Sequence, residues 1–209
     1  GPFKVSSATA ANWLRQPNPH GRPNSEVLKP IYNGSDLTRR WAGEWAIDFG
    51  ASMSETDAAY YAEPFAYATQ HVLPVREGNN RSSRSKYWWR HGEARPGMRN
   101  KLEPLSRYIA TVETAKHRFF VFLPTSVAPE HSLIVIPRAD DANFGILASR
   151  LHTVWTMNLG SPYGNHPTAR RYNASRTFET FPFPAGLTPS DTAHQRTETL
   201  ESGAVIPEI

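Results

Sequence analysis

The chain has 209 residues, a formal net charge of +4 at pH 7 and no cysteine, which excludes disulfides and thiolate metal sites and is compatible with a reducing cytoplasm. No run approaches the ~18 apolar residues of a membrane span, and the six Trp, eight Tyr and ten Phe provide enough large side chains for a core. We therefore expect a folded cytoplasmic protein without a membrane partner.

The N-terminal segment is expected to be largely irregular. The dipeptide Gly1-Pro2 is typical of the remnant that protease removal of a tag leaves, and residues 1–11 are interpreted as a lead-in to the domain. Residues 12–41 are interrupted repeatedly by breakers of regular structure: Pro17, Pro19, Gly21, Pro23 and Pro30. A first strand is expected at residues 45–49 (WAIDF), where apolar and polar residues alternate.

Helical segments are expected in the middle of the chain. Ser54 and Asp57 have the spacing of a capping box and predict a helix over residues 54–71. Pro64 lies inside this stretch and should kink the helix or divide it in two. Residues 81–91 predict a basic helix that carries two adjacent tryptophans.

The second half of the chain predicts a sheet followed by a helix. Segments rich in β-branched and aromatic residues predict strands at residues 107–112, 117–123 and 132–137. Apolar spacings of three and four predict a helix over residues 143–159 that ends at Gly160. Its apolar positions are Phe144, Leu147, Leu151, Val154 and Trp155. The expected fold class is therefore mixed α/β (α+β), a small and mostly antiparallel sheet with flanking helices and long polar loops.

One domain is expected over residues 12–186. Residues 187–209 have little periodicity, and from Ala185 onward four acids stand against one arginine. We interpret this end as a flexible acidic tail or as the start of a truncated C-terminal region.

No catalytic motif is found in the sequence. It contains no glycine-rich nucleotide loop, no zinc-binding H-E-x-x-H and no G-x-S-x-G. The eight histidines do not have the spacing of metal ligands. Asp140 and Asp141 suit the N-terminal dipole of the following helix better than a metal. We therefore expect no catalytic residue, no metal and no cofactor in this chain.

A basic segment indicates a binding surface. Between Arg76 and Lys101, eight Lys or Arg residues stand against two acids, a local charge of +6. Basic side chains neutralise phosphates, and Arg, Asn and Lys in loops can bond to base edges. Polar loops that suit such contacts, or that are only solvated connections, lie at residues 12–24, 78–84 and 165–171. Trp88 and Trp89 suit stacking on bases or, as is more common for paired tryptophans, anchoring to the core.

A series of strings, collinear between about residues 12 and 186, carries a family resemblance. They are 24–30 (NSEVLKP), 33–39 (NGSDLTR), 45–49 (WAIDF), 89–98 (WRHGEARPGM), 107–110 (RYIA), 115–123 (AKHRFFVFL), 133–137 (LIVIP), 143–160 and 177–184 (TFETFPFP). In this set the chain resembles the target-recognition domain of MmeI-type (type IIG/IIL) restriction-modification enzymes and related adenine-specific DNA methyltransferases.

The resemblance implies a sequence-specific recognition domain for double-stranded DNA. Its partner would be the methyltransferase domain of the same parent chain, which uses S-adenosylmethionine to methylate adenine at N6, with or without an attached nuclease. The fragment itself would be catalytically silent.

The resemblance also implies which positions contact DNA. Readers in such domains lie in the loop after the helix resembling 143–159 and on the turn before the strand resembling 133–137. By position, the loop gives Pro167, Ala169 and Arg171, and the turn gives His131 and Ser132. Because Pro167 and Ala169 stand where relatives often carry charged readers, we expect base reading by Asn165, His166, Arg170, Arg171, His131 and Ser132. Phosphate contacts are expected from Arg39, Arg81, Arg84, Lys86, Lys116 and Arg118.

These assignments have structural alternatives. Arg171 would also suit a pair with an acid near the helix end, and the basic residues would suit surface salt bridges. The aromatic residues Phe178, Phe181 and Phe183 are interpreted as core and docking contacts rather than readers. For the whole chain, the rival function is a protein-docking module that contacts a methyltransferase core without direct base readout.

Overall fold

The structure, a computed structural model, describes residues 1–78, 80–164, 166–192 and 197–207. The chain divides into two compact units. Unit 1 comprises Gly1–Tyr32, Arg40–Asn100 and Ser126–Ala128, and unit 2 comprises Asn33–Arg39, Lys101–Thr125 and Pro129–Ile209. The recognition domain predicted over residues 12–186 includes residues of both units, because the chain leaves unit 1 after Tyr32, contributes a short segment to unit 2 and then returns to unit 1.

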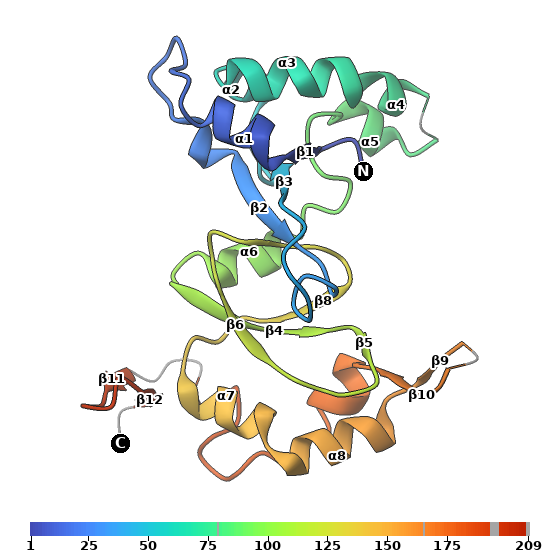
Figure 1. Ribbon diagram of the computed structural model, residues 1–209, viewed down its shortest axis with the longest axis vertical. Helices are drawn as coiled ribbons and strands as arrows, with labels where there is room; N and C mark the ends of the chain where they lie inside the picture. Colours follow the sequence, from blue (N-terminus) through green and yellow to red (C-terminus); the bar gives the residue numbers. More distant parts are fainter. Residues whose placement is uncertain (79, 165, 193–196, 208–209) are drawn as a thin grey trace. The chain divides into compact units, whose positions relative to one another are not determined.

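Unit 1 is built on a sheet with the strand order β1-β3-β2-β7 (Figure 1). Its strands are β1 (Lys4–Ser6), β3 (Glu44–Ile47), β2 (Leu28–Tyr32) and β7 (Ala128–Pro129). Residues 1–11, predicted as a lead-in, are instead part of this unit: they supply β1 and most of α1 (Ser7–Trp13). Phe3 and Val5 are buried in the core, and Val5 pairs with Trp45 of β3, so removing this segment would open the sheet.

The other helices that begin in unit 1 are short. They are η1 (Asn24–Glu26), α2 (Glu55–Ala58), α3 (Ala62–His71), α4 (Leu73–Glu77), α5 (Ser82–Lys86) and α6 (Pro96–Leu102). The predicted capping box is confirmed, because the Asp57 N–H donates to Ser54 Oγ at 3.0 Å. The predicted helix is divided in two, and Pro64 lies in the first turn of α3, where no backbone N–H is required. α5 ends before Trp88 and Trp89, so the helix predicted over residues 81–91 is shorter, and both rings are buried.

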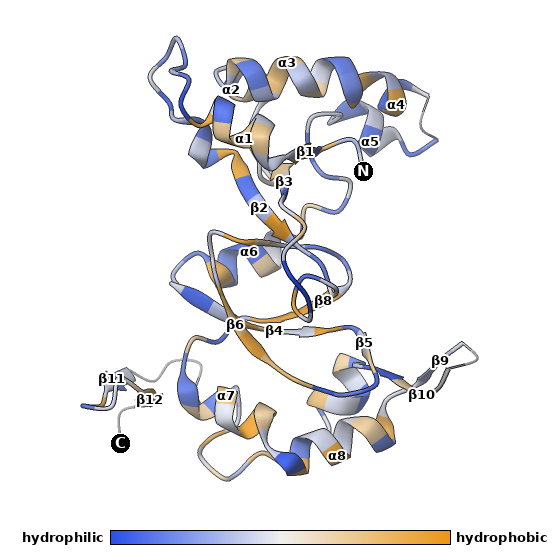
Figure 2. Ribbon diagram, in the orientation of Figure 1, coloured by the Kyte–Doolittle hydropathy of each residue, from blue (hydrophilic) through white to orange (hydrophobic). Residues whose placement is uncertain are grey.

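Unit 2 contains the predicted antiparallel sheet, in the order β6-β4-β8. Its strands are β4 (Arg107–Val112), β6 (Val121–Pro124) and β8 (Leu133–Ile136). Ile109 of the central strand pairs with Phe122 on one side and with Ile136 on the other. Figure 2 colours much of β6 as hydrophobic, and Ile109 and Ile136 pack with Leu147 of the following helix in one core cluster.

A second sheet of unit 2 has the order β5-β10-β9. Its strands are β5 (Thr114–Ala115), β10 (His166–Arg171) and β9 (Pro162–Tyr163). Residues 166–171, predicted as a polar loop, are therefore a strand. The residues of this stretch lack apolar alternation, and pairing with β5 stabilises the strand: Arg170 and Arg171 lie opposite Ala115 and Thr114.

The helix predicted over residues 143–159 is two helices, α7 (Asp141–Ala148) and α8 (Arg150–Leu159). Ser149 separates them with an extended backbone (φ −63°, ψ 156°), and its hydroxyl accepts the His152 N–H at 3.2 Å as the N-cap of α8. The break resets the helical phase, so the predicted apolar face does not continue. Leu151 and Val154 are 78% and 51% exposed, whereas His152 is buried.

Gly160 ends α8 as predicted, but its φ of −63° is not the left-handed conformation expected after a helix. Glycine is required here by a close approach, because a Cβ would lie 2.6 Å from the carbonyl oxygens of both Thr156 and Arg171. This contact joins the end of α8 to the end of β10. The chain then forms η2 (Ala174–Phe178), and Phe178 and Phe183 pack against the core as predicted.

Residues 187–209, interpreted as a flexible acidic tail or as the start of a truncated C-terminal region, contain ordered structure in the part that the structure describes. Thr192 is buried and its hydroxyl accepts from Asn143 Nδ2 at 3.1 Å. Farther along, β11 (Thr197–Thr199) and β12 (Val205–Pro207) form an antiparallel hairpin. The Val205 N–H donates to the Asp141 carboxylate, so α7 holds this end of the chain.

Candidate functional site

Unit 2 has a hollow with a volume of about 1000 Å³. Four separated parts of the sequence line it: the segment Asn33–Arg39, the end of β4 with β5 and the residues after it, the turn before β8, and the β9–β10 pair. The side chains with hydrogen-bonding or charged groups are Asn33, Ser35, Thr38, Arg39, Glu113, Thr114, Lys116, His117, Glu130, His131, Ser132 and Tyr163. Predicted base readers and predicted phosphate contacts therefore meet at one place.

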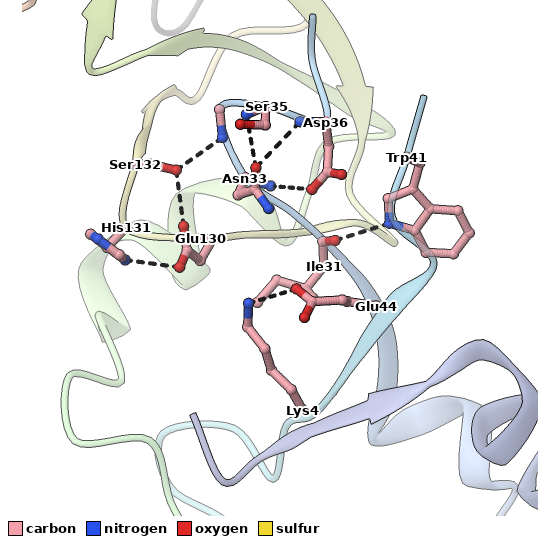
Figure 3. Close-up of polar contacts among 11 residues, drawn as sticks. Lys4, Ile31, Asn33, Ser35, Asp36, Trp41, Glu44, Glu130, His131 and Ser132 are labelled. Atoms are coloured by element: carbon pink, nitrogen blue, oxygen red, sulfur yellow. Dashed lines mark hydrogen bonds and ion pairs between the residues drawn. The ribbon is translucent and has the colours of Figure 1, made fainter. Parts of the chain in front are cut away.

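The turn before β8 presents two of the predicted readers. The Leu133 N–H donates to the Glu130 carbonyl at 2.9 Å, which closes a turn with His131 and Ser132 at its corner. The Glu130 carboxylate contacts both residues: Oε1 lies 3.0 Å from His131 Nδ1, and Oε2 accepts from Ser132 Oγ at 2.9 Å (Figure 3). The His131 side chain is 87% exposed, so its ring is held by one edge and open at the other.

The segment Asn33–Arg39 forms a second turn against the first. Asn33 organises it: its side-chain oxygen accepts the Ser35 N–H at 2.8 Å, and its own N–H donates to Asp36 Oδ2 at 2.9 Å (Figure 3). The Gly34 N–H donates to Ser132 Oγ at 2.9 Å and links the two turns. A Cβ at Gly34 would lie 2.8 Å from Val112 Cγ1, so only glycine fits without displacing β4.

Strand β10 places one predicted reader toward the hollow and another away from it. Ala169 lines the hollow. Arg171 is exposed, and its guanidinium carbon lies 5.0 Å from the ring centre of Tyr163, which also lines the hollow. The Arg170 side chain instead lies beside Gly160 at the end of α8. Arg170 does not line the hollow, and its role in base reading stays a prediction.

Two other predicted readers lie at the edge of what the structure describes. Asn165 falls outside the described residues. His166 begins β10 and pairs through its backbone with Tyr163. Both stay predictions.

Two of the predicted phosphate contacts line the hollow. Arg39 and Lys116 are exposed, and they stand among the acids Glu113 and Glu130. The lining is therefore mixed in charge and offers both hydrogen-bond donors and acceptors. Such a lining suits base edges, which present both kinds of group, better than a uniformly basic surface would.

Arg118 is buried, with 7% exposure, and the prediction that it contacts phosphate is wrong. Its guanidinium donates to Thr111 Oγ1 at 3.1 Å, to the Val112 carbonyl, and to the Arg170 carbonyl at 3.0 Å. Burial lowers the pKa of Arg118 to about 10, so it stays charged at neutral pH. The side chain ties β4 to β10 and thus holds one wall of the hollow.

The other predicted phosphate contacts lie in unit 1. Arg81 and Lys86 are exposed, and Lys86 Nζ lies 5.4 Å from the ring centre of Tyr87. Arg84 is half-buried and packs against the backbone of Gly92, where a Cβ would lie 2.8 Å from its Nε. They form a basic group that does not line the hollow, and their phosphate role stays a prediction.

The acidic pair before α7 has a structural role. Asp140 Oδ1 accepts the Asn143 N–H at 2.7 Å as an N-cap, and Asp141 pairs with Arg107 at 3.0 Å. Within the ranges that the structure describes, no three metal-ligating side chains gather. None of the helices described there is long and apolar enough to cross a membrane.

Sequence reasoning missed three residues that shape the hollow. Glu130 holds the reader pair, Gly34 permits the contact between the turns, and Tyr163 lies beneath Arg171. The Asn-Gly-Ser-Asp string at 33–36 is a strong turn signal. It could have located the turn, but only the fold shows that this turn meets Ser132, which is distant in sequence.

The hollow thus gathers cations and hydrogen-bonding side chains from four segments, as a binding site requires. The chain belongs to the family described as MmeI, target recognition domain, whose model matches residues 22–185. A similar solved structure is that of the type IIL restriction-modification enzyme MmeI in complex with DNA, with a TM-score of 0.66 and 16% identity over 88% of this chain. The chain spans 23% of that protein, which shares its fold. No curated protein matches the chain.

Proposed function

We propose that this domain selects a double-stranded DNA sequence at the hollow of unit 2 for an enzyme of which it is one part. The observation that carries the proposal is the convergence of Arg39, Lys116, the His131-Ser132 turn and the Arg171 side of β10 around one hollow. The family match supports the same role, because the family is a target recognition domain.

The chemistry divides between two kinds of contact. Arg39 and Lys116 are exposed cations that would bind backbone phosphates, which supplies affinity independent of sequence. Arg171, His131 and Ser132 would bond to base edges, which supplies specificity. The guanidinium of Arg171 suits guanine, whose O6 and N7 it can contact together.

We further propose that the parent is a restriction-modification enzyme that methylates adenine at N6 in the cytoplasm. The similar solved protein is named as such a restriction-modification enzyme and was solved with DNA. The methyltransferase domain of the parent enzyme would bind S-adenosylmethionine and extrude the target base from the duplex. The domain described here would then position the DNA and take no part in bond making.

The test is selection of preferred sequences from a pool of random duplexes by the 209-residue chain, at several salt concentrations. We expect a defined sequence, with an affinity that falls linearly with salt on logarithmic axes. Arg171→Ala should relax the choice of base at one position and weaken binding to the selected sequence by about 1–3 kcal/mol. Arg171→Lys, which keeps the charge but not the paired donors, should relax the same position. Binding of all sequences with equal strength, or no binding at low salt, would refute the proposal.

A docking module is the second candidate. The observation in its favour is the exposed apolar pair on α8, where Leu151 and Val154 are 78% and 51% exposed. If the chain selects no duplex but binds the separately produced remainder of its parent, and Leu151→Ser abolishes that binding, docking is the function. If the Leu151→Ser variant still selects the same DNA sequence, DNA recognition does not depend on the exposed apolar pair of α8.

A further inference from the structure

One carboxylate holds both predicted readers of the turn before β8. Glu130 uses Oε2 for Ser132 Oγ and Oε1 for His131 Nδ1, at 2.9 and 3.0 Å (Figure 3). Its side chain is 21% exposed and lines the hollow, and each of its two oxygens is engaged by one of these contacts. These two contacts determine which hydrogen-bonding groups of His131 and Ser132 remain available to a ligand.

The Ser132 hydroxyl has one hydrogen to donate and two lone pairs to accept with. An ionised carboxylate only accepts, so the hydroxyl hydrogen is directed to Glu130 Oε2. One lone pair receives the Gly34 N–H at 2.9 Å. What remains toward the hollow is a single lone pair, and Ser132 can only accept from a ligand.

His131 is restricted in the same way. Because the carboxylate accepts, Nδ1 carries the hydrogen, and in the neutral ring Nε2 is then an acceptor. The side chain is 87% exposed, so Nε2 faces outward. The pair therefore presents two acceptors side by side.

We propose that Glu130 is a positioning residue that sets the hydrogen-bond polarity of Ser132 and His131, so that this turn selects a base with an exocyclic amino group. In the major groove, adenine N6 and cytosine N4 carry such donors, whereas guanine O6 and thymine O4 are acceptors. The inference rests on the proposed function, since it names what that site prefers.

The decisive variant is Glu130→Gln. The amide has one accepting oxygen and one donating nitrogen in place of two accepting oxygens. If the nitrogen faces Ser132, the hydroxyl hydrogen is released toward the DNA. If it faces His131, Nδ1 becomes an acceptor and Nε2 becomes a donor. Either orientation reverses the polarity of one reader.

The experiment is sequence selection with the wild-type chain and with Glu130→Gln under the same conditions. At one position we expect the wild type to prefer adenine or cytosine, and the variant to lose or reverse that preference by roughly fivefold or more. Glu103→Gln removes the same charge at an exposed position of unit 2 that does not line the hollow. It should leave every base preference unchanged. In a His131→Ala/Ser132→Ala background, adding Glu130→Gln should have no further effect on preference.

The outcomes separate the two proposals. If the wild type selects no sequence, the proposed function fails and the inference fails with it. If the wild type selects a sequence and folded Glu130→Gln keeps the same base at every position, only the polarity inference fails. If the variant does not fold, the ring tautomer of His131 in the wild-type chain decides, as measured by long-range ¹H–¹⁵N NMR. A hydrogen on Nδ1 supports the inference, and a neutral ring with its hydrogen on Nε2 overturns it.

Discussion

The basic segment of unit 1 and the hollow of unit 2 differ in how their cations are held. Unit 1 contains most of the segment with a local charge of +6, and part of that charge is bonded within the unit, while Arg81 and Lys86 are exposed. Arg90 donates to the carbonyls of Ala51, Ser52 and Met53, at 3.0 to 3.1 Å. In unit 2 the cations of the hollow are few, but Arg39 is exposed. The density of charge in a sequence is therefore not enough to locate a binding surface, because the partners of each charge decide whether it is available.

The same contrast holds for hydrogen-bonding aromatic residues. In unit 1 the indole N–H groups of Trp88 and Trp89 donate to Glu55 Oε1 and to the Met53 carbonyl, both at 3.0 Å. These rings are buried anchors rather than platforms for bases. In unit 2, Tyr163 is 45% exposed at the wall of the hollow, beneath Arg171. Residue type alone does not distinguish these two uses.

The largest effect that would test this comparison is expected from Arg99→Ala. Arg99 makes two bonds to Asp48, at 2.8 and 2.9 Å, and the Asp48 side chain is 5% exposed. Burial alone would raise the pKa of Asp48, but the bonds to Arg99 outweigh it and lower that pKa. Without Arg99 the buried carboxylate loses its ion pair and keeps the Gly50 N–H at 3.0 Å, which should cost about 3–5 kcal/mol of unfolding free energy in urea titrations.

The matched control for that change is Arg95→Ala in the same basic segment. Arg95 pairs with Glu93, and both side chains are exposed, at 68% and 60%. Its loss should cost less than about 1 kcal/mol. Equal losses in the two variants would contradict the view that the basic segment is bonded internally.

An intermediate effect is expected from pH, and it should be seen in both units. Burial lowers the pKa of His91 in unit 1 and of His152 in unit 2. Between the lowered pKa and the ordinary one, the unfolded chain therefore binds more protons than the folded chain. The folded state keeps its full stability above the ordinary histidine pKa of about 6.5 and loses stability as the pH falls below that value. The midpoint temperature of thermal unfolding should therefore decrease when the pH is lowered from 7.5 to 5. A midpoint that does not change with pH would refute this.

Exposed histidines supply the control for the pH dependence. His117→Gln should leave the profile unchanged, because its side chain is exposed. His152 is held between the Leu147 carbonyl, 2.9 Å from Nδ1, and the Tyr172 hydroxyl, 3.3 Å from Nε2. If His117→Gln removed the pH dependence, the assignment to buried rings would be wrong.

The smallest effect is expected from Arg39→Gln, and only on binding. Arg39 is exposed at the hollow, so thermal stability should not change. DNA affinity should fall by a few-fold for all sequences, and the salt slope should decrease by about 1. Arg40→Gln changes the neighbouring residue, which is exposed but does not line the hollow, and should leave the slope unaltered. Identical slopes in the two variants would remove Arg39 from the phosphate contacts.

Local chemistry allowed correct prediction of several elements. The strands β4 and β8 follow from β-branched residues, and the start of α2 follows from the Ser54–Asp57 capping box. The break at Ser149 was not predicted, because serine is tolerated within a helix and its role as an N-cap depends on packing on both sides. Strand β10 was missed because its pairing with β5 involves residues distant in sequence.

The sequence brought together several residues that the structure places at one hollow, but it did not show the direction of their side chains. His131, Ser132, Arg39 and Lys116 all line the hollow. Arg170 and Arg118 are turned away or buried, and composition cannot show this, because direction depends on strand register and packing. The positioning role of Glu130 depends on hydrogen bonds that only the fold brings together.

Strand β10 is fastened at the end nearest Arg171. Gly160 packs against the Arg171 carbonyl, Arg118 donates to the Arg170 carbonyl, and the Tyr172 N–H donates to the Glu113 carbonyl at 2.7 Å. These contacts involve the backbone of β10 and not its outward side chains. Substitutions at the exposed positions Thr168 and Arg171 should therefore leave the contacts that hold the strand in place. Under the proposed function, such substitutions would change the target sequence while the rest of the domain stays the same.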